Sequence, residues 1–157
     1  MQSDLLRPVS LFHDLSGDEL QVLNNLFSLR EVAPKQKIVA EGMPMHEFYV
    51  VCKGSVHARR MAQKREMLLG RIGEGGFFGE INLFNEGTAT ASVYSAEAAT
   101  LAVAENAALR QFMAENTEIG YKIVSELLVE LSRRMRHTNE RFVNSLYWSS
   151  LSADAPA

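Results

Sequence analysis

Short apolar runs separated by turn residues dominate the middle of the chain, from about residue 30 to residue 103. Glycine or proline stands in three of the five gaps between the runs, at Pro44, at Gly54 and in the cluster Gly73, Gly75 and Gly76. Short strands at spacings of roughly 8 to 12 residues, with turns between them, are typical of an antiparallel sandwich or barrel. The apolar runs are residues 37–40, 48–51, 55–58, 67–69, 92–94 and 100–103.

Helical patterns flank this zone on both sides. In residues 1–29, Ser16 and Glu19 form a capping box, and an apolar face follows it at helical spacing. In residues 105–150, a short helix at residues 107–113 precedes a long helix that begins near Asn116 and ends near Trp148. We therefore expect one α+β domain over residues 1–150, with the β zone at 30–104, followed by a flexible tail at 151–157.

The long helix carries an apolar seam with spacings of four, three, four, three and four residues. Such a heptad seam usually faces another helix, and a second copy of the chain is the partner we expect. The alternative is that the helix packs across the β zone of its own chain. Thr138, the polar member, either tunes the register between two helices or faces a ligand. The seam comprises Val124, Leu128, Leu131, Met135, Thr138 and Phe142.

Composition excludes several classes of protein. Hydrophobic residues make up 46% of the 157 residues, so the chain is not wholly disordered. A net charge of -3 argues against a general nucleic-acid binder. The lone Cys52 cannot form an internal disulfide and reads as a small core residue. We find no run of roughly 20 apolar residues and no signal peptide, so we expect a cytoplasmic protein without membrane association.

Catalytic and metal-site motifs are absent from the sequence. There is no Gly-x-Ser-x-Gly element, no P-loop and no Cys–His pairing, so we do not expect an enzyme. The histidines, His13, His46, His57 and His137, do not have the spacing of metal ligands, and no metal or cofactor is expected.

Two motifs in order identify a family. Glu41-Gly42 followed by residues 48–56, Phe-Tyr-Val-Val-Cys-Lys-Gly-Ser-Val, resembles the early β-roll turn of the cyclic nucleotide-binding domain. Residues 76–84, Gly-Phe-Phe-Gly-Glu-Ile-Asn-Leu-Phe, resemble its phosphate-binding cassette, and residues 90–93 resemble the end of that cassette. The long helix at residues 131–141 is similar to that of the bacterial catabolite-activator branch. The resemblance implies a double-stranded β-helix, or jelly-roll β-roll, with a C-terminal dimerisation helix.

The resemblance also implies roles for individual residues. A cyclic phosphate needs backbone N–H donors, and Gly79 lets the chain come close to it. Glu80 would accept a hydrogen bond from the ribose 2′-hydroxyl; the alternative is that it only caps local backbone amides. The N–H groups of Ile81, Ala89 and Thr90 would contact the phosphate. Leu69 and Ile72 would form an apolar wall near the base, and Thr138 and Asn139 of the long helix would contact the purine.

One departure from the family pattern concerns charge. The family places an arginine nine positions after the glutamate, where this chain has Ala89, and there is no arginine between Arg71 and Arg110. A hydrogen bond to a charged group contributes about 1.5–3 kcal/mol, so its loss weakens binding by roughly 10- to 100-fold. Two readings stay open: weak binding of cyclic AMP or cyclic GMP, with Arg71 or Arg134 as the replacement cation, or a degenerate pocket that serves another ligand or none. Whether Arg134 reaches Glu80 or lies on a solvated face is equally open.

The second departure is the lack of a helix-turn-helix domain after the long helix, for which roughly 60 residues would be needed. We therefore do not expect direct DNA binding. The expected function is regulatory: a sensor or adaptor module that signals through a dimeric C-terminal helix. The alternative is a homodimeric scaffold for a protein partner, with no nucleotide bound.

Overall fold

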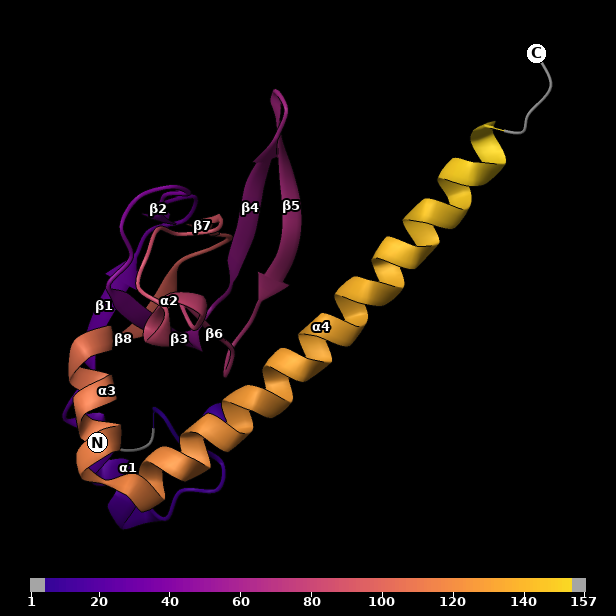
Figure 1. Cartoon of the computed structure of the whole chain (residues 1–157). Coiled ribbons are helices and arrows are strands. Elements are labelled where there is room, and N and C mark those ends of the chain that lie inside the picture. The colour runs from indigo at the N-terminus through magenta and orange to yellow at the C-terminus, as the bar shows by residue number, and fades with distance from the viewer. Residues whose placement is uncertain (1–4, 154–157) are drawn as a thin grey trace.

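Two antiparallel sheets form the centre of the molecule in a computed structural model that describes residues 5–153 (Figure 1). Each sheet has four strands, and the chain passes back and forth between the two sheets, mostly through short connections. The first sheet has the order β1 (Ser28–Val32), β8 (Ala99–Glu105), β3 (Glu47–Lys53) and β6 (Phe77–Phe78). The second has the order β2 (Lys37–Val39), β7 (Ser92–Ser95), β4 (Val56–Ala62) and β5 (Arg65–Ile72). The expected β-roll is confirmed.

Strand β3 contains an unbroken run of apolar residues, and the structure explains why. Side chains alternate between the two faces of a strand, and here both faces are covered. Phe48 and Val50 enter a cluster shared with the helices, whereas Tyr49 and Val51 enter the cluster between the sheets. The strand therefore joins two hydrophobic cores.

The N-terminal segment is less helical than its sequence pattern predicts. From residue 5 onward it has a 3-10 turn at Ser10–Phe12 and one α-helix, α1 (Gly17–Asn24), before the chain enters β1 at Ser28. The predicted capping box is present: Glu19 N–H donates to Ser16 Oγ at 3.3 Å, and Ser16 N–H donates to Glu19 Oε2 at 2.8 Å.

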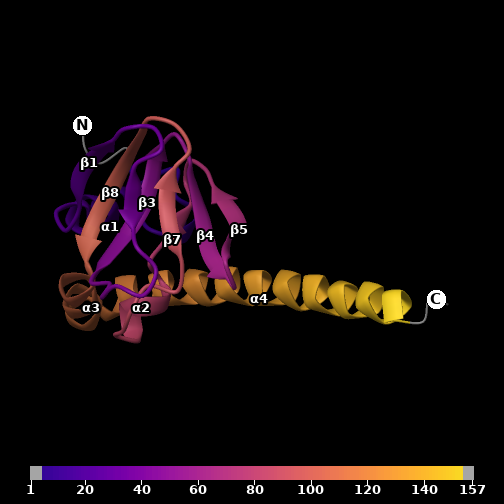
Figure 2. The same ribbon diagram turned by 90° about the horizontal axis from the view of Figure 1, so that it is seen from above.

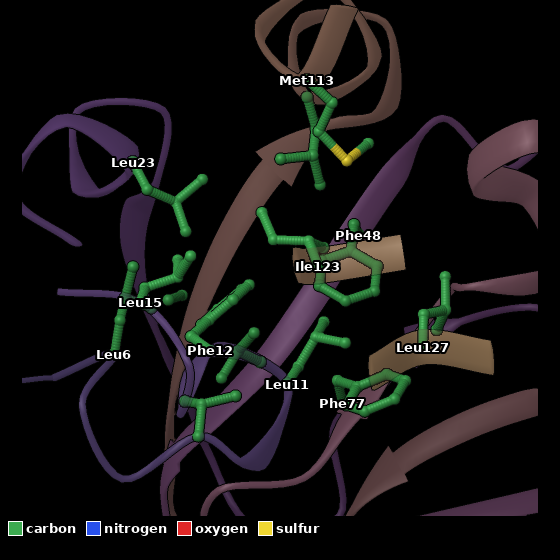
Figure 3. Packing of buried hydrophobic residues seen from close by; sticks show 14 of the residues in the cluster. Leu6, Leu11, Phe12, Leu15, Leu23, Phe48, Phe77, Met113, Ile123 and Leu127 are labelled. Carbon is green, nitrogen blue, oxygen red and sulfur yellow. The ribbon is translucent and has the colours of Figure 1, made fainter. Parts of the chain in front are cut away.

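Two helices follow the β-roll, α3 (Asn106–Glu115) and α4 (Thr117–Ala153). Gly120 lets α4 approach α3, because a Cβ atom there would lie 2.6 Å from the Met113 carbonyl oxygen. Ile123 and Leu127 of α4 are buried against Leu11, Phe12, Phe48 and Phe77 in one cluster (Figure 3). Beyond them α4 runs past the β-roll and projects away from it (Figures 1 and 2).

The predicted tail begins too early. Residues 151–153 continue α4, because they include no glycine or proline that would end the helix. Ser149, Ser150 and Ser152 satisfy their hydroxyls by donating to carbonyl oxygens in the preceding turn. The rest of the predicted tail, residues 154–157, and residues 1–4 lie outside the described part of the chain. Among the described helices, none is both long enough and apolar enough to cross a bilayer.

Candidate functional site

A cavity of about 730 Å³ lies between the β-roll and α4. It is lined by the cassette, which includes the short helix α2 (Ile81–Phe84), by β5 and β7, and by one face of α4. Nine of the ten residues assigned to ligand binding from the sequence line this cavity. They are Leu69, Ile72, Gly79, Glu80, Ile81, Ala89, Thr90, Arg134 and Thr138.

Gly79 sets the path of the cassette. Its φ is +90°, and a Cβ atom would lie 2.7 Å from the Glu47 carbonyl oxygen. A side chain there would thus meet both backbone strain and a steric clash. This turn directs Glu80 into the cavity from the start of α2, where the Glu80 side chain caps no backbone amide. The capping alternative for Glu80 is therefore wrong.

Glu80 and Arg134 join the cassette to α4. Arg134 Nη1 donates to Glu80 Oε1 at 2.6 Å, and the side chains are 8% and 37% exposed for Glu80 and Arg134, respectively. Of the two readings of Arg134, the one in which it reaches Glu80 is confirmed. A charge-assisted hydrogen bond to a carboxylate as little exposed as that of Glu80 is stronger than an ion pair between two exposed groups.

Arg134 has three further contacts that fix its position. Its Nε donates to Glu130 Oε1 at 3.0 Å, one helical turn earlier on α4. Its guanidinium carbon lies 4.8 Å from the centre of the Phe77 ring, and Nη2 lies 3.4 Å from the Phe77 carbonyl oxygen. Arg134 therefore interacts with two carboxylates, and its charge is already compensated.

Ala89 departs from the role that the resemblance implies. Its N–H donates to the Met43 carbonyl oxygen at 2.8 Å, so it cannot face a phosphate. Its side chain is buried in the core between the sheets. The cause is the bridge that this segment forms with the loop after β2, in which Met45 N–H also bonds to the Gly87 carbonyl oxygen. The next residue, Thr90, is exposed and lines the cavity.

The remaining predicted residues divide between the cavity and the surface. Ile72 is partly buried, and Leu69 is 48% exposed at the cavity edge. Asn139 is exposed on α4 and does not line the cavity, so the structure does not bring it to the site. Arg71 borders the cavity but donates to Ser55 Oγ at 2.8 Å and lies 3.5 Å from Glu97.

Three cavity residues on α4 were missed in the sequence. Glu130, His137 and Arg141 line the cavity from α4, with Arg134 between the first two. Positions 130, 134, 137 and 141 are four, three and four residues apart, so they share one helix face. That periodicity was available in the sequence, starting from Arg134.

The heptad seam is exposed for most of its length. Val124 is 41% exposed, whereas Leu128, Met135 and Phe142 are each more than 60% exposed. Only Leu131 packs against the core of its own chain. The alternative in which α4 packs across the β zone of its own chain therefore holds for the part of α4 that carries Ile123 and Leu127, which lie off the seam, and for Leu131 on the seam.

Two titratable groups away from the cavity, Cys52 and His13, have a raised pKa. Burial raises the pKa of the Cys52 thiol, which suits the expected inert core residue. His13, Asp14 and Glu126 place ligand atoms within 4.8 Å of one another, although their sequence positions gave no such signal. A hydrogen bond to the Ser10 carbonyl oxygen, assisted by these two carboxylates, raises the pKa of His13.

Comparisons with known proteins agree with this architecture. Over 145 residues, the chain is 26% identical to the CRP-like cAMP-activated global transcriptional regulator of Mycobacterium tuberculosis, covering 92% of this chain and 63% of that protein. The chain therefore spans less than two thirds of that relative's length.

Solved structures give the same fold. The N-terminal domain of a transcriptional regulator from Streptomyces coelicolor A3(2) superposes with a TM-score of 0.72 and 26% identity, covering 88% of this chain and 95% of that one. The Thermus thermophilus catabolite activator protein superposes with a TM-score of 0.78 and 24% identity, covering 88% of this chain and 63% of that one; this likeness shows the fold alone.

The family model of the cyclic nucleotide-binding domain matches residues 29–116, which include both motifs and the whole cassette. With its β-roll, its cassette glutamate and its long C-terminal helix, the chain belongs to the cyclic nucleotide-binding domain family and is similar to the catabolite-activator branch.

Proposed function

We propose that this chain is a regulatory module that binds a cyclic nucleotide between its β-roll and α4 and transmits occupancy of the cavity through α4 to a second copy. The observation that carries this proposal is the hydrogen bond of 2.6 Å between Arg134 and Glu80. It ties the element that would hold the ligand to the element that would carry the signal.

The Glu80 carboxylate has a free hydrogen-bond acceptor, which a ribose hydroxyl requires. Arg134 occupies Oε1, and the Glu80 carboxylate accepts no second hydrogen bond from the described residues. Oε2 can therefore accept from a 2′-hydroxyl while Oε1 keeps the arginine. A ligand in this position would compete with or reinforce the existing link, and either effect changes how strongly α4 is held.

The exposed seam supports the second half of the proposal. Leu128, Met135 and Phe142 offer apolar surface at heptad spacing, which two copies of α4 would bury against each other. Any change in the angle or packing of α4 at Arg134 would then pass along the paired helices to whatever they contact. The Mycobacterium tuberculosis relative is named as activated by cAMP, and we extend that ligand class to this chain.

The alternative, a dimeric scaffold with an unused pocket, is favoured by one observation. Residues 72–109 contain no arginine or lysine, so the whole cassette lacks a positive side chain. A cyclic phosphate buried there would have no counter-charge from the cassette.

Calorimetric titration with cyclic AMP and cyclic GMP separates the two candidates. The sensor predicts micromolar binding that Glu80→Ala abolishes. Glu86→Ala is the matched control, because Glu86 lies in the same segment but pairs with Arg110 outside the cavity. Absence of heat and of any thermal shift at millimolar nucleotide would reject the sensor and leave the scaffold.

A further inference from the structure

His13, Asp14 and Glu126 form a cluster of metal-ligating side chains outside the cavity. One ligand atom from each residue lies within 4.8 Å of the ligand atoms of the other two. His13 and Asp14 directly follow the 3-10 turn at Ser10–Phe12, whereas Glu126 belongs to α4. An imidazole nitrogen and carboxylate oxygens are ligands that Zn²⁺ takes in proteins. The fold therefore brings such a ligand set together from two elements that are far apart in the sequence.

The His13 ring is oriented by the backbone. Its Nδ1 lies 2.7 Å from the Ser10 carbonyl oxygen, which can only accept, so Nδ1 carries a hydrogen and donates it. Histidines that bind a metal almost always donate their other ring N–H to a carbonyl or carboxylate oxygen in this way. Nε2 is thus the ring nitrogen that can bind a metal ion.

The two carboxylates lie beside this ring and pair with no other group. Asp14 Oδ1 lies 3.1 Å from Nε2, and Glu126 Oε2 lies 3.6 Å from Nδ1. Two ligand atoms on a tetrahedral Zn²⁺ are about 3.3–3.5 Å apart, so Nε2 and Asp14 Oδ1 are close to the required separation. Because Nδ1 is occupied, the Glu126 side chain must rotate to reach an ion at Nε2.

The charge at the cluster suits a divalent cation. Within residues 5–153, neither Asp14 nor Glu126 forms a salt bridge with any residue except His13. Lys122, one turn before Glu126 on α4, pairs with Glu19 instead. Two carboxylates therefore lie together without a lysine or arginine to neutralise them.

The backbone that carries the ligands is held by the core. Phe12, which precedes His13, is buried in the same cluster as Ile123 and Leu127, which lie on either side of Glu126 in the sequence (Figure 3). The ligand side chains themselves are 56%, 54% and 24% exposed, in chain order, so an ion can reach them from solvent. Binding groups mounted on rigid elements form a more precise site than groups on mobile loops.

We propose that His13, Asp14 and Glu126 bind a Zn²⁺ ion through His13 Nε2 and one oxygen of each carboxylate, with water completing the coordination. Mg²⁺ and Ca²⁺ take oxygen ligands, usually six or more, whereas an imidazole nitrogen favours Zn²⁺. The ion ties the N-terminal segment to α4. This site goes beyond the proposed function and does not depend on it, because none of the three residues lines the cavity.

Zn²⁺ binding has a measurable consequence for stability. The three ligands come together only in the folded chain, so the ion binds that state better than the unfolded state and raises the unfolding temperature. We would titrate the untagged full chain with ZnCl₂, using calorimetry for the affinity and thermal unfolding for the shift. The expected result is one ion per chain and a higher unfolding temperature.

Four variants show whether the ion binds at this cluster. Losing an outer partner of a metal ligand already costs roughly 10- to 100-fold in affinity, so His13→Gln and Glu126→Gln should each weaken Zn²⁺ binding by at least about 10-fold. His46→Gln and Glu140→Gln are the matched controls, because both residues are exposed, Glu140 also lies on α4, and neither belongs to the cluster. The controls should leave the affinity unchanged. Unfolding in EDTA checks beforehand that each variant is folded.

Three results would overturn the proposal. The first is that the unaltered chain shows neither heat nor a thermal shift at millimolar Zn²⁺. The second is that both cluster variants weaken binding no more than their controls, which would place the ion elsewhere. The third is that His13→Gln weakens binding and Glu126→Gln does not, in which case the ion does not reach α4. Cyclic nucleotide titrations in EDTA test the proposed function separately, so either proposal can fail alone.

Discussion

The two halves of α4 have the same secondary structure but different surroundings. From Thr117 to Arg134 the helix is fixed by buried Ile123 and Leu127, by the Lys122–Glu19 ion pair at 2.9 Å and by the Arg134–Glu80 bond. From residue 135 to residue 153 every side chain is exposed. Long helices in proteins take most of their stability from packing one apolar face, so we expect the distal half, unlike the proximal half, to pack against a partner.

This comparison separates two tasks within one helix. The proximal half packs on the core and lines the cavity with Glu130 and Arg134, whereas the distal half lines it with His137, Thr138 and Arg141 and otherwise offers exposed apolar surface. The boundary between them lies at Arg134, the residue that also contacts the cassette. The following predictions test that division.

The largest expected effect comes from the neighbouring leucines Leu127 and Leu128. Leu127 is 4% exposed and Leu128 is 63% exposed. Leu127→Ala should lower the free energy of unfolding by about 2–4 kcal/mol, because it leaves a cavity in the core. Leu128→Ala should change it by less than about 0.5 kcal/mol in dilute samples, where copies do not associate. Urea unfolding measures both, and equal losses would contradict the division.

Gly120 tests the start of the proximal half. The Cβ atom of Gly120→Ala would meet the Met113 carbonyl oxygen, so α3 and α4 must separate. We expect a loss of about 1–3 kcal/mol in thermal or urea unfolding. Gly17→Ala is the control, since Gly17 begins α1 with its nearest contact at 3.9 Å and alanine favours a helix. A stabilised Gly120→Ala variant would show that the two helices do not pack so closely.

The distal half is tested through association of two copies. Phe142 lies on the seam and Trp148 lies about 120° around the helix from it, and both are more than 60% exposed. Phe142→Ala should weaken dimerisation by roughly 10-fold, because the seam loses a large apolar side chain. Trp148→Ala should have little effect. Sedimentation velocity over a concentration series measures the dimerisation of both variants. An unaltered chain that stays monomeric at every concentration would contradict dimerisation through α4.

The smallest expected effect is a pH dependence in the proximal half. A hydrogen bond from the Ser16 backbone, with Lys122 as second cause, lowers the pKa of Glu19 from 4.5. A lowered acid pKa stabilises the fold above the unfolded value and loses that contribution as the pH falls below about 4.5. Glu19→Gln should therefore show a smaller loss of stability between pH 6 and pH 3 than the unaltered chain. Parallel acid-unfolding curves would contradict this link between α1 and α4.

The sequence predicted most of the fold because its signals are local. The capping box at Ser16 needs only four consecutive residues, and the strands of the β-roll follow from short apolar runs between turns. The seam on α4 likewise follows from helical spacing, and its exposure agrees with the expectation that another helix covers it. Whether that helix belongs to a second copy stays a prediction.

The site was predicted less well because its chemistry depends on pairs far apart in the chain. The Ala89 N–H was expected to face a ligand, but the backbone of Met43 takes it. The resemblance supplied Glu80, whereas its bond to Arg134 spans 54 residues and required the structure. His137 and Arg141 were missed because the family pattern drew attention to the cassette and to Thr138 rather than to the face of α4 below Arg134.

We expect occupancy of the cavity to change how α4 is held against the β-roll and the cassette. Hydrogen–deuterium exchange of the α4 amides, with and without saturating cyclic AMP, tests it most directly. We expect the nucleotide to alter exchange around Arg134 and in the distal half, from residue 135 to residue 153, and Arg134→Gln to remove the distal change. Saturated binding that protects only the cassette and leaves α4 exchange unaltered would contradict the claim.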